Sequence, residues 1–233
     1  MQPGETATSA ALSRHPDEIT PSDSPLRCED VMASPVIQRI STPTLAAGDP
    51  AYDFTLPELD LSSGVARRSG RMFHLAEHAG LRPVALIFGS YTSPPFRRQL
   101  PAIEALYGRY REEVAFVVVY IREAHPEDGW MVIDNREENI RVFDPTTDAE
   151  RRRVVEECAA GLAVRIPVVI DEIEDGVAGA YGGWPDRLYL VGHDGRIAFQ
   201  GGMGPFGFLP TELEAAIEEE VRGQSDEPRV KGP

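Results

Sequence analysis

The stretch of this sequence best suited to chemistry is residues 88–96, which read Phe-Gly-Ser-Tyr-Thr-Ser-Pro-Pro-Phe. An apolar run stops there at a glycine, hydroxyl-bearing side chains follow, and two prolines mark the first turn of a helix. Ligands bind at such junctions in α/β sheets, because the helix N-terminus offers free N–H groups and positive potential. Ser93 occupies the position best placed for a nucleophile.

The identity of residue 93 limits the chemistry open to it. A thiol has a pKa of about 8.5, and a helix N-terminus lowers it, so that a thiolate forms near neutral pH. A serine hydroxyl does not ionise in this range and cannot take part in thiol exchange. Two interpretations of Ser93 follow: it is a helix N-cap, a position that serine favours, or it stands where a chalcogen nucleophile has been replaced.

The junction lies between two predicted parallel strands. Residues 84–88 and 114–121 are continuous apolar runs, as expected of strands buried on both faces. Residues 94–110 between them have helical periodicity, and such a strand-helix-strand unit makes its strands parallel neighbours with a right-handed connection. Their carboxyl ends then share one edge, which brings the polar segment 122–130 toward Ser93.

Alternating helices and strands extend this unit toward the C-terminus, and an edge hairpin is predicted ahead of it. The hairpin strands are residues 48–57 and 72–75, where apolar side chains alternate between turn formers. The later elements are a helix at 147–162 with Cys158 on its inner face, a strand at 166–171, a hairpin at 184–191 and 196–200, and a closing helix at 210–221.

This order of elements resembles the thioredoxin fold, an α/β domain with a central mixed sheet and flanking helices, here with an N-terminal β-hairpin extension. Three stretches are also similar to the signature motifs of the iodothyronine deiodinase family. They are residues 88–96, 120–130 and 186–189. The resemblance covers residues 48–221, and it is specific because the three motifs occur in the right order at a single-domain spacing.

The resemblance implies roles for individual residues. In that family the position of Ser93 is a selenocysteine, or a cysteine in some members, which attacks the iodine of an iodinated phenol. Arg187 matches an arginine associated with substrate positioning, and Pro185 stands where thioredoxin folds carry a cis-proline facing the site. The remaining matches belong to a network that relays protons to the reacting centre. They are Ser90, Thr92, Tyr120, Glu123 and His125.

These residue types suit proton transfer on chemical grounds as well. A histidine titrates near neutrality, and a neighbouring carboxylate fixes its tautomer, so His125 and Glu123 are a sensible pair. The alternative is that both side chains form hydrogen bonds that only shape the loop before Pro126.

The two ends of the chain are expected to lie outside the folded domain. Residues 1–44 are rich in proline and serine without sustained periodicity, which predicts a disordered tail. Apolar residues around Cys28 leave a short docking segment as the alternative. The folded domain is predicted at 45–222, with a disordered tail at 223–233. Cys28 and Cys158 lie far apart in sequence and suggest neither a disulfide framework nor a zinc site.

Composition limits the partners. The formal net charge of −15 argues against nucleic acids and anionic membranes, because both are polyanions. No apolar run approaches the roughly 20 residues of a membrane span, and no signal-peptide pattern is visible, so we expect a soluble, cytoplasmic protein. The resemblance implies a small aromatic or halogenated substrate and an external thiol reductant or thioredoxin-like donor. No cofactor or metal is expected, and a homodimer is an allowed assembly.

Three functions are compatible with these patterns. The first is a deiodinase-like oxidoreductase for reductive dehalogenation or thiol-dependent redox chemistry, inactive or weak as written because Ser93 replaces the nucleophile. The second is a non-catalytic binding module for a phenolic ligand or a protein partner. The third is a peroxiredoxin-like enzyme using Cys28 or Cys158, which has the least support because neither cysteine lies at the strand-to-helix junction.

Overall fold

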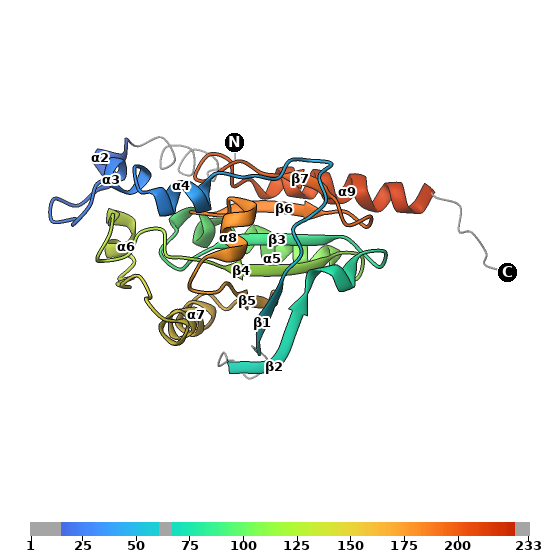
Figure 1. Ribbon diagram of the computed structural model, residues 1–233, viewed down its shortest axis with the longest axis horizontal. Helices are drawn as coiled ribbons and strands as arrows, with labels where there is room; N and C mark the ends of the chain where they lie inside the picture. The colour runs from blue at the N-terminus through green and yellow to red at the C-terminus, as the bar shows by residue number, and fades with distance from the viewer. Residues whose placement is uncertain (1–14, 61–66, 227–233) are drawn as a thin grey trace, which may run out of the picture.

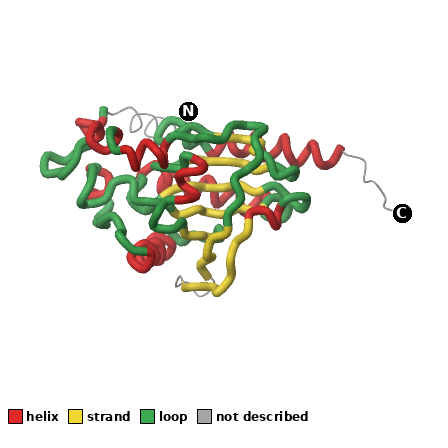
Figure 2. The backbone as a smooth tube through the Cα atoms, viewed as in Figure 1, coloured by secondary structure: helices red, strands yellow, loops and turns green. Residues whose placement is uncertain are grey.

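The computed structural model describes residues 15–60 and 67–226. A seven-stranded sheet crosses the molecule in the order β2-β1-β5-β4-β3-β6-β7, and its strands are stacked one above another in Figures 1 and 2. The strands are β1 (Thr55–Asp60), β2 (Arg67–His74), β3 (Val84–Gly89), β4 (Ala115–Tyr120), β5 (Val168–Ile170), β6 (Arg187–Val191) and β7 (Ile197–Gln200).

Helices cover both faces of this sheet. They are α2 (Pro16–Ile19), α3 (Cys28–Met32), α4 (Pro35–Ser41), the short 3-10 helix η1 (Leu75–His78), α5 (Pro94–Tyr110), α6 (Ile133–Glu137), α7 (Asp148–Gly161), α8 (Gly176–Tyr181) and α9 (Pro210–Asp226).

The centre of the sheet has the predicted topology. β3 runs parallel to β4, with Val84 opposite Ala115 and Gly89 opposite Tyr120. β4 is also parallel to β5, whereas β6 lies antiparallel on the other side of β3 and pairs with β7. The prediction of a mixed α/β sheet is therefore confirmed, and the carboxyl ends of β3 and β4 lie at one edge.

The predicted edge hairpin is present, with a longer second strand than expected. β1 pairs antiparallel with β2, which begins at Arg67 rather than near Met72. β1 also joins the main sheet, since Glu58 lies opposite Val169 of β5.

Two apolar clusters fill the space between the sheet and its helices. Ala85 and Ile87 of β3 belong to the cluster that includes α5, α7 and α9, and this cluster also contains Cys158, as predicted. Leu86 and Phe88, which alternate with them, belong to the cluster that includes α3, α4 and α8. Both faces of β3 are thus buried, which is why its sequence is a continuous apolar run.

The prediction of disorder for the N-terminal tail is wrong for residues 15–44. These residues form α2, α3 and α4, and Ile40 of α4 is completely buried in the second apolar cluster. Pro16 and Pro35, which contributed to the prediction, occupy the first turns of helices, where proline is tolerated. The backbone N–H of Trp184 donates to the carbonyl of Ile40 at 3.0 Å, which ties the segment to the core.

The remaining end predictions lie mostly outside the described residues. Residues 1–14 and 227–233 fall outside them, as do residues 61–66 between β1 and β2. The closing helix α9 continues past the expected boundary at 222 to Asp226. Within the described part of the chain, no helix has the length and apolar character needed to cross a membrane.

Truncating the N-terminal helix α4 at its buried position tests this packing. Ile40→Ala removes a fully buried side chain, and we expect it to lower the free energy of unfolding by about 2–5 kcal/mol. Chemical denaturation measures this loss. Val36→Ala on the same helix is the matched control, since Val36 is 43% exposed. Equal stabilities of the two variants would show that α4 does not belong to the folded core.

Candidate active site

The strand-to-helix junction is tightly packed around Ser93. Gly89 ends β3, and a Cβ atom on it would collide with the ring of Phe96, so only glycine allows this close approach. Ser93 is the N-cap of α5, with its Oγ accepting a hydrogen bond from the backbone N–H of Phe96 at 3.4 Å. Its own N–H donates to the carbonyl of Ser90 at 3.2 Å. The side chain is completely buried.

Glu123 is the central acceptor beneath this junction. Its Oε2 accepts hydrogen bonds from the backbone N–H and the Oγ1 hydroxyl of Thr92, at 3.0 and 2.6 Å. Its Oε1 accepts from the hydroxyl of Tyr120 at 2.5 Å, and that hydroxyl oxygen accepts from the N–H of Tyr91 at 2.9 Å. Burial raises the pKa of Glu123, and these hydrogen bonds oppose the rise. Glu123 is thus a buried carboxyl that accepts hydrogen bonds from two hydroxyls.

Ser90, Thr92 and His125 complete the predicted cluster. The hydroxyl of Ser90 accepts from the N–H of Ala124 at 3.1 Å, and the hydroxyl of Thr92 accepts from the N–H of His125 at 3.1 Å. These bonds tie the loop after β3 to the loop after β4. The structure therefore brings all six residues predicted as catalytic into one region.

The environment of His125 differs from the prediction. The Nδ1 atom lies 3.1 Å from the carbonyl oxygen of Trp130, so this carbonyl, rather than the carboxylate of Glu123, fixes the tautomer. The imidazole also meets the indole of Trp130 edge-on at 4.5 Å between ring centroids. Burial lowers the pKa of His125 to about 4, so the ring is neutral at physiological pH.

Asp186 is a site residue that the sequence reasoning missed. Its Oδ2 accepts a hydrogen bond from the hydroxyl of Ser93 at 2.5 Å. The residue is completely buried, and burial raises its pKa to about 7, with the bond from Ser93 opposing the rise. Its Oδ1 has no hydrogen-bond partner among the described residues. A Cβ on Gly204 would overlap with this oxygen, so glycine is required beside the carboxylate.

Arg187 is buried away from the cavity, which corrects the prediction that it positions a substrate. Its Nε donates to the carbonyl of Gly182 at 2.8 Å, NH1 to that of Gly201 at 2.9 Å, and NH2 to that of Ser41 at 3.2 Å. The guanidinium is thus a structural tie between three backbone segments. Pro185, the other predicted binding residue, does lie at the cavity and follows a cis peptide bond after Trp184.

A cavity of about 320 Å³ lies beside the N-terminus of α5. Its lining is mainly apolar and aromatic, with His125, Asp186 and an ion pair between Arg98 and Asp134 as polar groups. Cys28 lies on its wall, although the sequence placed this cysteine in a disordered tail. The other lining residues are Pro16, Ile19, Met32, Pro94, Pro95, Trp130, Val132, Trp184, Pro185, Met203, Gly204, Pro205 and Phe206.

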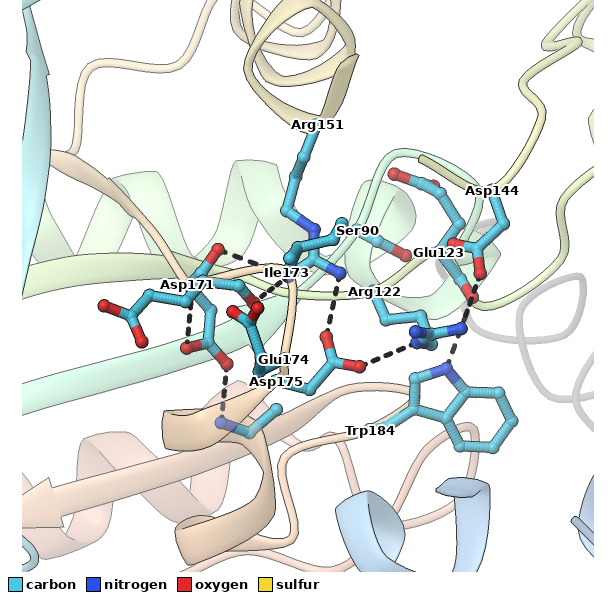
Figure 3. A network of polar contacts seen from close by, with 12 residues as sticks. Ser90, Arg122, Glu123, Asp144, Arg151, Asp171, Ile173, Glu174, Asp175 and Trp184 are labelled. Carbon is cyan, nitrogen blue, oxygen red and sulfur yellow. Dashed lines mark hydrogen bonds and ion pairs between the residues drawn. The ribbon is translucent and has the colours of Figure 1, made fainter. Parts of the chain in front are cut away.

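A buried ionic network fixes the segment that carries Glu123. Figure 3 shows Arg122 and Arg151 reaching the carboxylate of Asp175 from two sides, at 2.7 and 2.8 Å. Arg122 also pairs with Asp144 at 2.7 Å. The indole Nε1 of Trp184 donates to the carbonyl of Glu123 at 3.3 Å. The loop after β4 is therefore held by this network as well as by its hydrogen bonds to the junction.

Across residues 15–60 and 67–226, no group of three or more His, Cys, Asp or Glu side chains is arranged to hold a metal ion.

Comparison with protein families gives a match over most of the folded region. A family model described as iodothyronine deiodinase matches residues 55–221. The thyroxine 5-deiodinase of Homo sapiens is 36% identical over 149 residues, which are 62% of this chain and 46% of that protein. The type I iodothyronine deiodinase of Xenopus laevis is 33% identical over 153 residues, which are 64% of this chain and 58% of that protein. The match to the human protein thus spans about half of its length.

Solved structures share the fold at low sequence identity. A structure described as a candidate thiol:disulfide interchange protein DsbE from Chlorobium tepidum has a TM-score of 0.51 and 20% identity, covering 77% of this chain and 98% of that one. A hypothetical protein from Sinorhizobium meliloti 1021 has a TM-score of 0.53 and 20% identity, covering 77% and 86%. Similarity at this level shows the thioredoxin-like fold alone.

Replacing the buried carboxyl of Asp186 should change how stability depends on pH. The pKa of about 7 in the folded protein lies above the ordinary aspartate pKa of 3.8, so between these values the folded state keeps a proton that the unfolded state releases. Wild-type stability therefore falls as pH rises from 4 to 7. Asp186→Asn removes this penalty, and we expect its stability relative to wild type to rise over this interval by on the order of 4 kcal/mol.

Urea denaturation between pH 4 and 8 measures the difference. Asp194→Asn, which replaces an exposed turn carboxylate, is the control for losing a carboxylate outside the buried site. A constant difference between Asp186→Asn and wild type across this range would contradict the expected titration.

Proposed function

The chain belongs to the iodothyronine deiodinase family, and from this premise we propose that its cavity binds a halogenated aromatic compound, with residue 93 as the place of reductive chemistry. The observation that carries the proposal is the position of the cavity. It lies beside the N-terminus of α5, at the edge where the loops after β3 and β4 meet. Apolar walls with a few convergent polar groups are typical of small-molecule sites.

The proposed reaction needs a chalcogen at position 93. A thiolate there attacks the halogen, the electron pair of the carbon–halogen bond stays on the ring carbon, and that carbon takes up a proton. An external thiol then displaces halide from the sulfur–halogen bond and leaves a mixed disulfide with residue 93. A second equivalent of the external thiol reduces this disulfide and restores the thiol at residue 93, so the external thiol is the net reductant. Glu123 and its hydroxyl partners Thr92 and Tyr120 are suited to supplying the proton.

Ser93 makes the chain as written a ligand-binding protein with little or no turnover. Its hydroxyl already donates to Asp186 and accepts from the N–H of Phe96, which are the contacts of an N-cap. The second candidate function, a binding module for a phenolic ligand or a protein partner, draws its support from these same contacts. In both cases the ligand occupies the cavity.

A peroxiredoxin-like function has weaker support. Cys158 is buried in the apolar core, and burial raises the pKa of its thiol, which disfavours a thiolate. Cys28 lies at the cavity, but burial and the nearby carboxylates of Asp17 and Glu29 raise its pKa too.

The partners follow from the same proposal. We propose an external thiol or a thioredoxin-like protein as the reductant, and a small aromatic molecule as substrate. The net charge of −15 supports the prediction that nucleic acids and anionic membranes are not partners. A cytoplasmic location and a homodimer stay predictions.

Introducing sulfur at position 93 tests the redox proposal. We expect Ser93→Cys to release iodide from 2-iodophenol in the presence of dithiothreitol at a rate about 100-fold above wild type, because the helix N-terminus stabilises a thiolate. Iodide release and calorimetric binding are measured on the same samples, with Ser93→Ala as the control that binds without turnover. A folded Ser93→Cys protein that binds but turns over neither this phenol nor a peroxide would leave only the binding module.

Replacing the titratable carboxyl of Glu123 with an amide tests the proton relay. In the Ser93→Cys background, Glu123→Gln should lower the rate of iodide release by about 100-fold while the affinity for the phenol stays unchanged. Glu127→Gln is the matched control, because Glu127 lies on the same segment and pairs with Arg141 instead. Equal rates for the two variants would assign Glu123 a purely structural role.

A further inference from the structure

Arg98 is the one lysine or arginine among the described residues that line the cavity. It lies on α5, and the cavity-lining part of that helix consists of Pro94, Pro95 and Arg98. Residues three and four positions apart share one face of a helix, so Arg98 follows the two prolines on the same side. A guanidinium stays charged at every physiological pH, and the cavity wall therefore carries one permanent positive charge.

Most of the hydrogen-bond donors of Arg98 are unused. Within residues 15–60 and 67–226, its one polar contact is an ion pair from NH2 to the Oδ2 atom of Asp134, at 3.1 Å. The Nε and NH1 atoms have no protein acceptor in that part of the chain. The side chain of Arg98 is 36% exposed and that of Asp134 is 19% exposed, and a partly exposed pair of this kind contributes little stability. A ligand can therefore compete for the guanidinium or share it.

Two neighbouring arginines show what a purely structural guanidinium looks like in this protein. Arg97 precedes Arg98 on α5 and donates from Nε, NH1 and NH2 to three different residues. Arg187 likewise donates from all three nitrogen atoms, in its case to backbone carbonyls. Both side chains are buried. Arg98 differs from them because it faces the cavity with donors to spare.

The other polar groups of the cavity favour an anion at Arg98 and at no other place. Burial lowers the pKa of His125 to about 4, so this imidazole is neutral and cannot balance a ligand's negative charge. Asp186 is a carboxyl and contacts Ser93. Arg98 lies about 7.5 Å from residue 93 along the helix axis, at about 1.5 Å per residue. An aromatic ligand with its acidic group at Arg98 can thus direct its ring toward residue 93.

A carboxylate is the anion that best fits these donors. The planar fork of a guanidinium donates two parallel hydrogen bonds to the two oxygens of a carboxylate, which fixes its orientation as well as its distance. The net charge of −15 opposes anions at long range. Salt screens charges in solvent beyond about 8 Å, so the preference inside the cavity depends on the side chains that line it.

We propose that Arg98 is a specificity-determining residue of the cavity and binds the carboxylate of a halogenated aromatic acid. The inference rests on the proposed function, since it takes this cavity as the aromatic site. It adds a second functional group to the ligand and names the side chain that recognises it. Arg98 lies outside the three motifs at 88–96, 120–130 and 186–189.

The test compares two probes on the full-length chain, 4-hydroxy-3,5-diiodobenzoate and 4-hydroxy-3,5-diiodobenzamide. The probes share the diiodophenol ring and differ in the charge of the group opposite the hydroxyl. Calorimetry gives both affinities, and protection of Cys28 from alkylation by iodoacetamide reports occupancy, because Cys28 lines the cavity while Cys158 is buried. We expect wild type to bind the acid about tenfold more tightly than the amide, with a preference that shrinks as salt is added.

Replacing Arg98 should remove this preference. In Arg98→Gln the affinity for the acid is expected to fall by about tenfold while the affinity for the amide is unchanged. Arg98→Lys should keep part of the preference, because it retains the charge and loses the fork. Arg111→Gln is the matched control, since Arg111 is the C-cap of the same helix and does not line the cavity. Thermal melting confirms that each variant is folded.

The failures of the two proposals can be told apart. With Cys28 protected by both probes, this inference alone is overturned by any of three results in folded proteins. These are equal or weaker binding of the acid by wild type, a preference that persists in Arg98→Gln, and an equal loss of both affinities in that variant. No binding, or binding without protection of Cys28, overturns the proposed function and the inference with it. An Arg98-dependent preference in a protein whose Ser93→Cys variant releases no iodide supports the inference and overturns only the proposed redox chemistry.

Discussion

The carboxyl of Glu123 is buried, and burying such a group costs several kcal/mol unless protein donors replace the water that it loses. Those donors come from Thr92, just before α5, and from Tyr120, at the end of β4. Moving either segment would leave the carboxylate without partners. The need to satisfy this one group therefore fixes the distance between the two loops, and with it the position of Ser93.

The same constraint explains why much of the site could be predicted from sequence. Two apolar runs joined by a helix must become parallel neighbours, so residues that follow them gather at one edge whatever their individual contacts. The roles of Asp186 and Arg187 are harder to predict from sequence, because β6, which pairs antiparallel with β3, brings them to the site. Adjacent residues of a strand point to opposite faces: Asp186, just before β6, contacts Ser93, while Arg187 holds backbone carbonyls. No spacing in the sequence distinguishes these roles.

The N-terminal segment shows a different limit of sequence reasoning. Its proline- and serine-rich composition predicts disorder. Its helices are also too short to form in isolation, since helices below about 12 residues are marginal in water. Tertiary packing orders these helices, because Ile37 and Ile40 of α4 join an apolar cluster with residues of the sheet and of α8. That the segment covers a cavity, and carries Cys28 to its wall, follows only from the partner surface.

Position 93 is where structure and reactivity make opposite demands. Serine satisfies the structure, because its small hydroxyl both accepts the capping bond of α5 and donates to Asp186. Sulfur is a larger atom and a weaker hydrogen-bonding partner. A thiolate at the same place would face the carboxylate of Asp186, and like charges at this distance oppose each other's ionisation. It forms readily only while Asp186 holds a proton, which a pKa of about 7 permits near neutral pH. By binding a proton, the buried carboxylate of Asp186 becomes neutral, and the repulsion of an anion at residue 93 is removed.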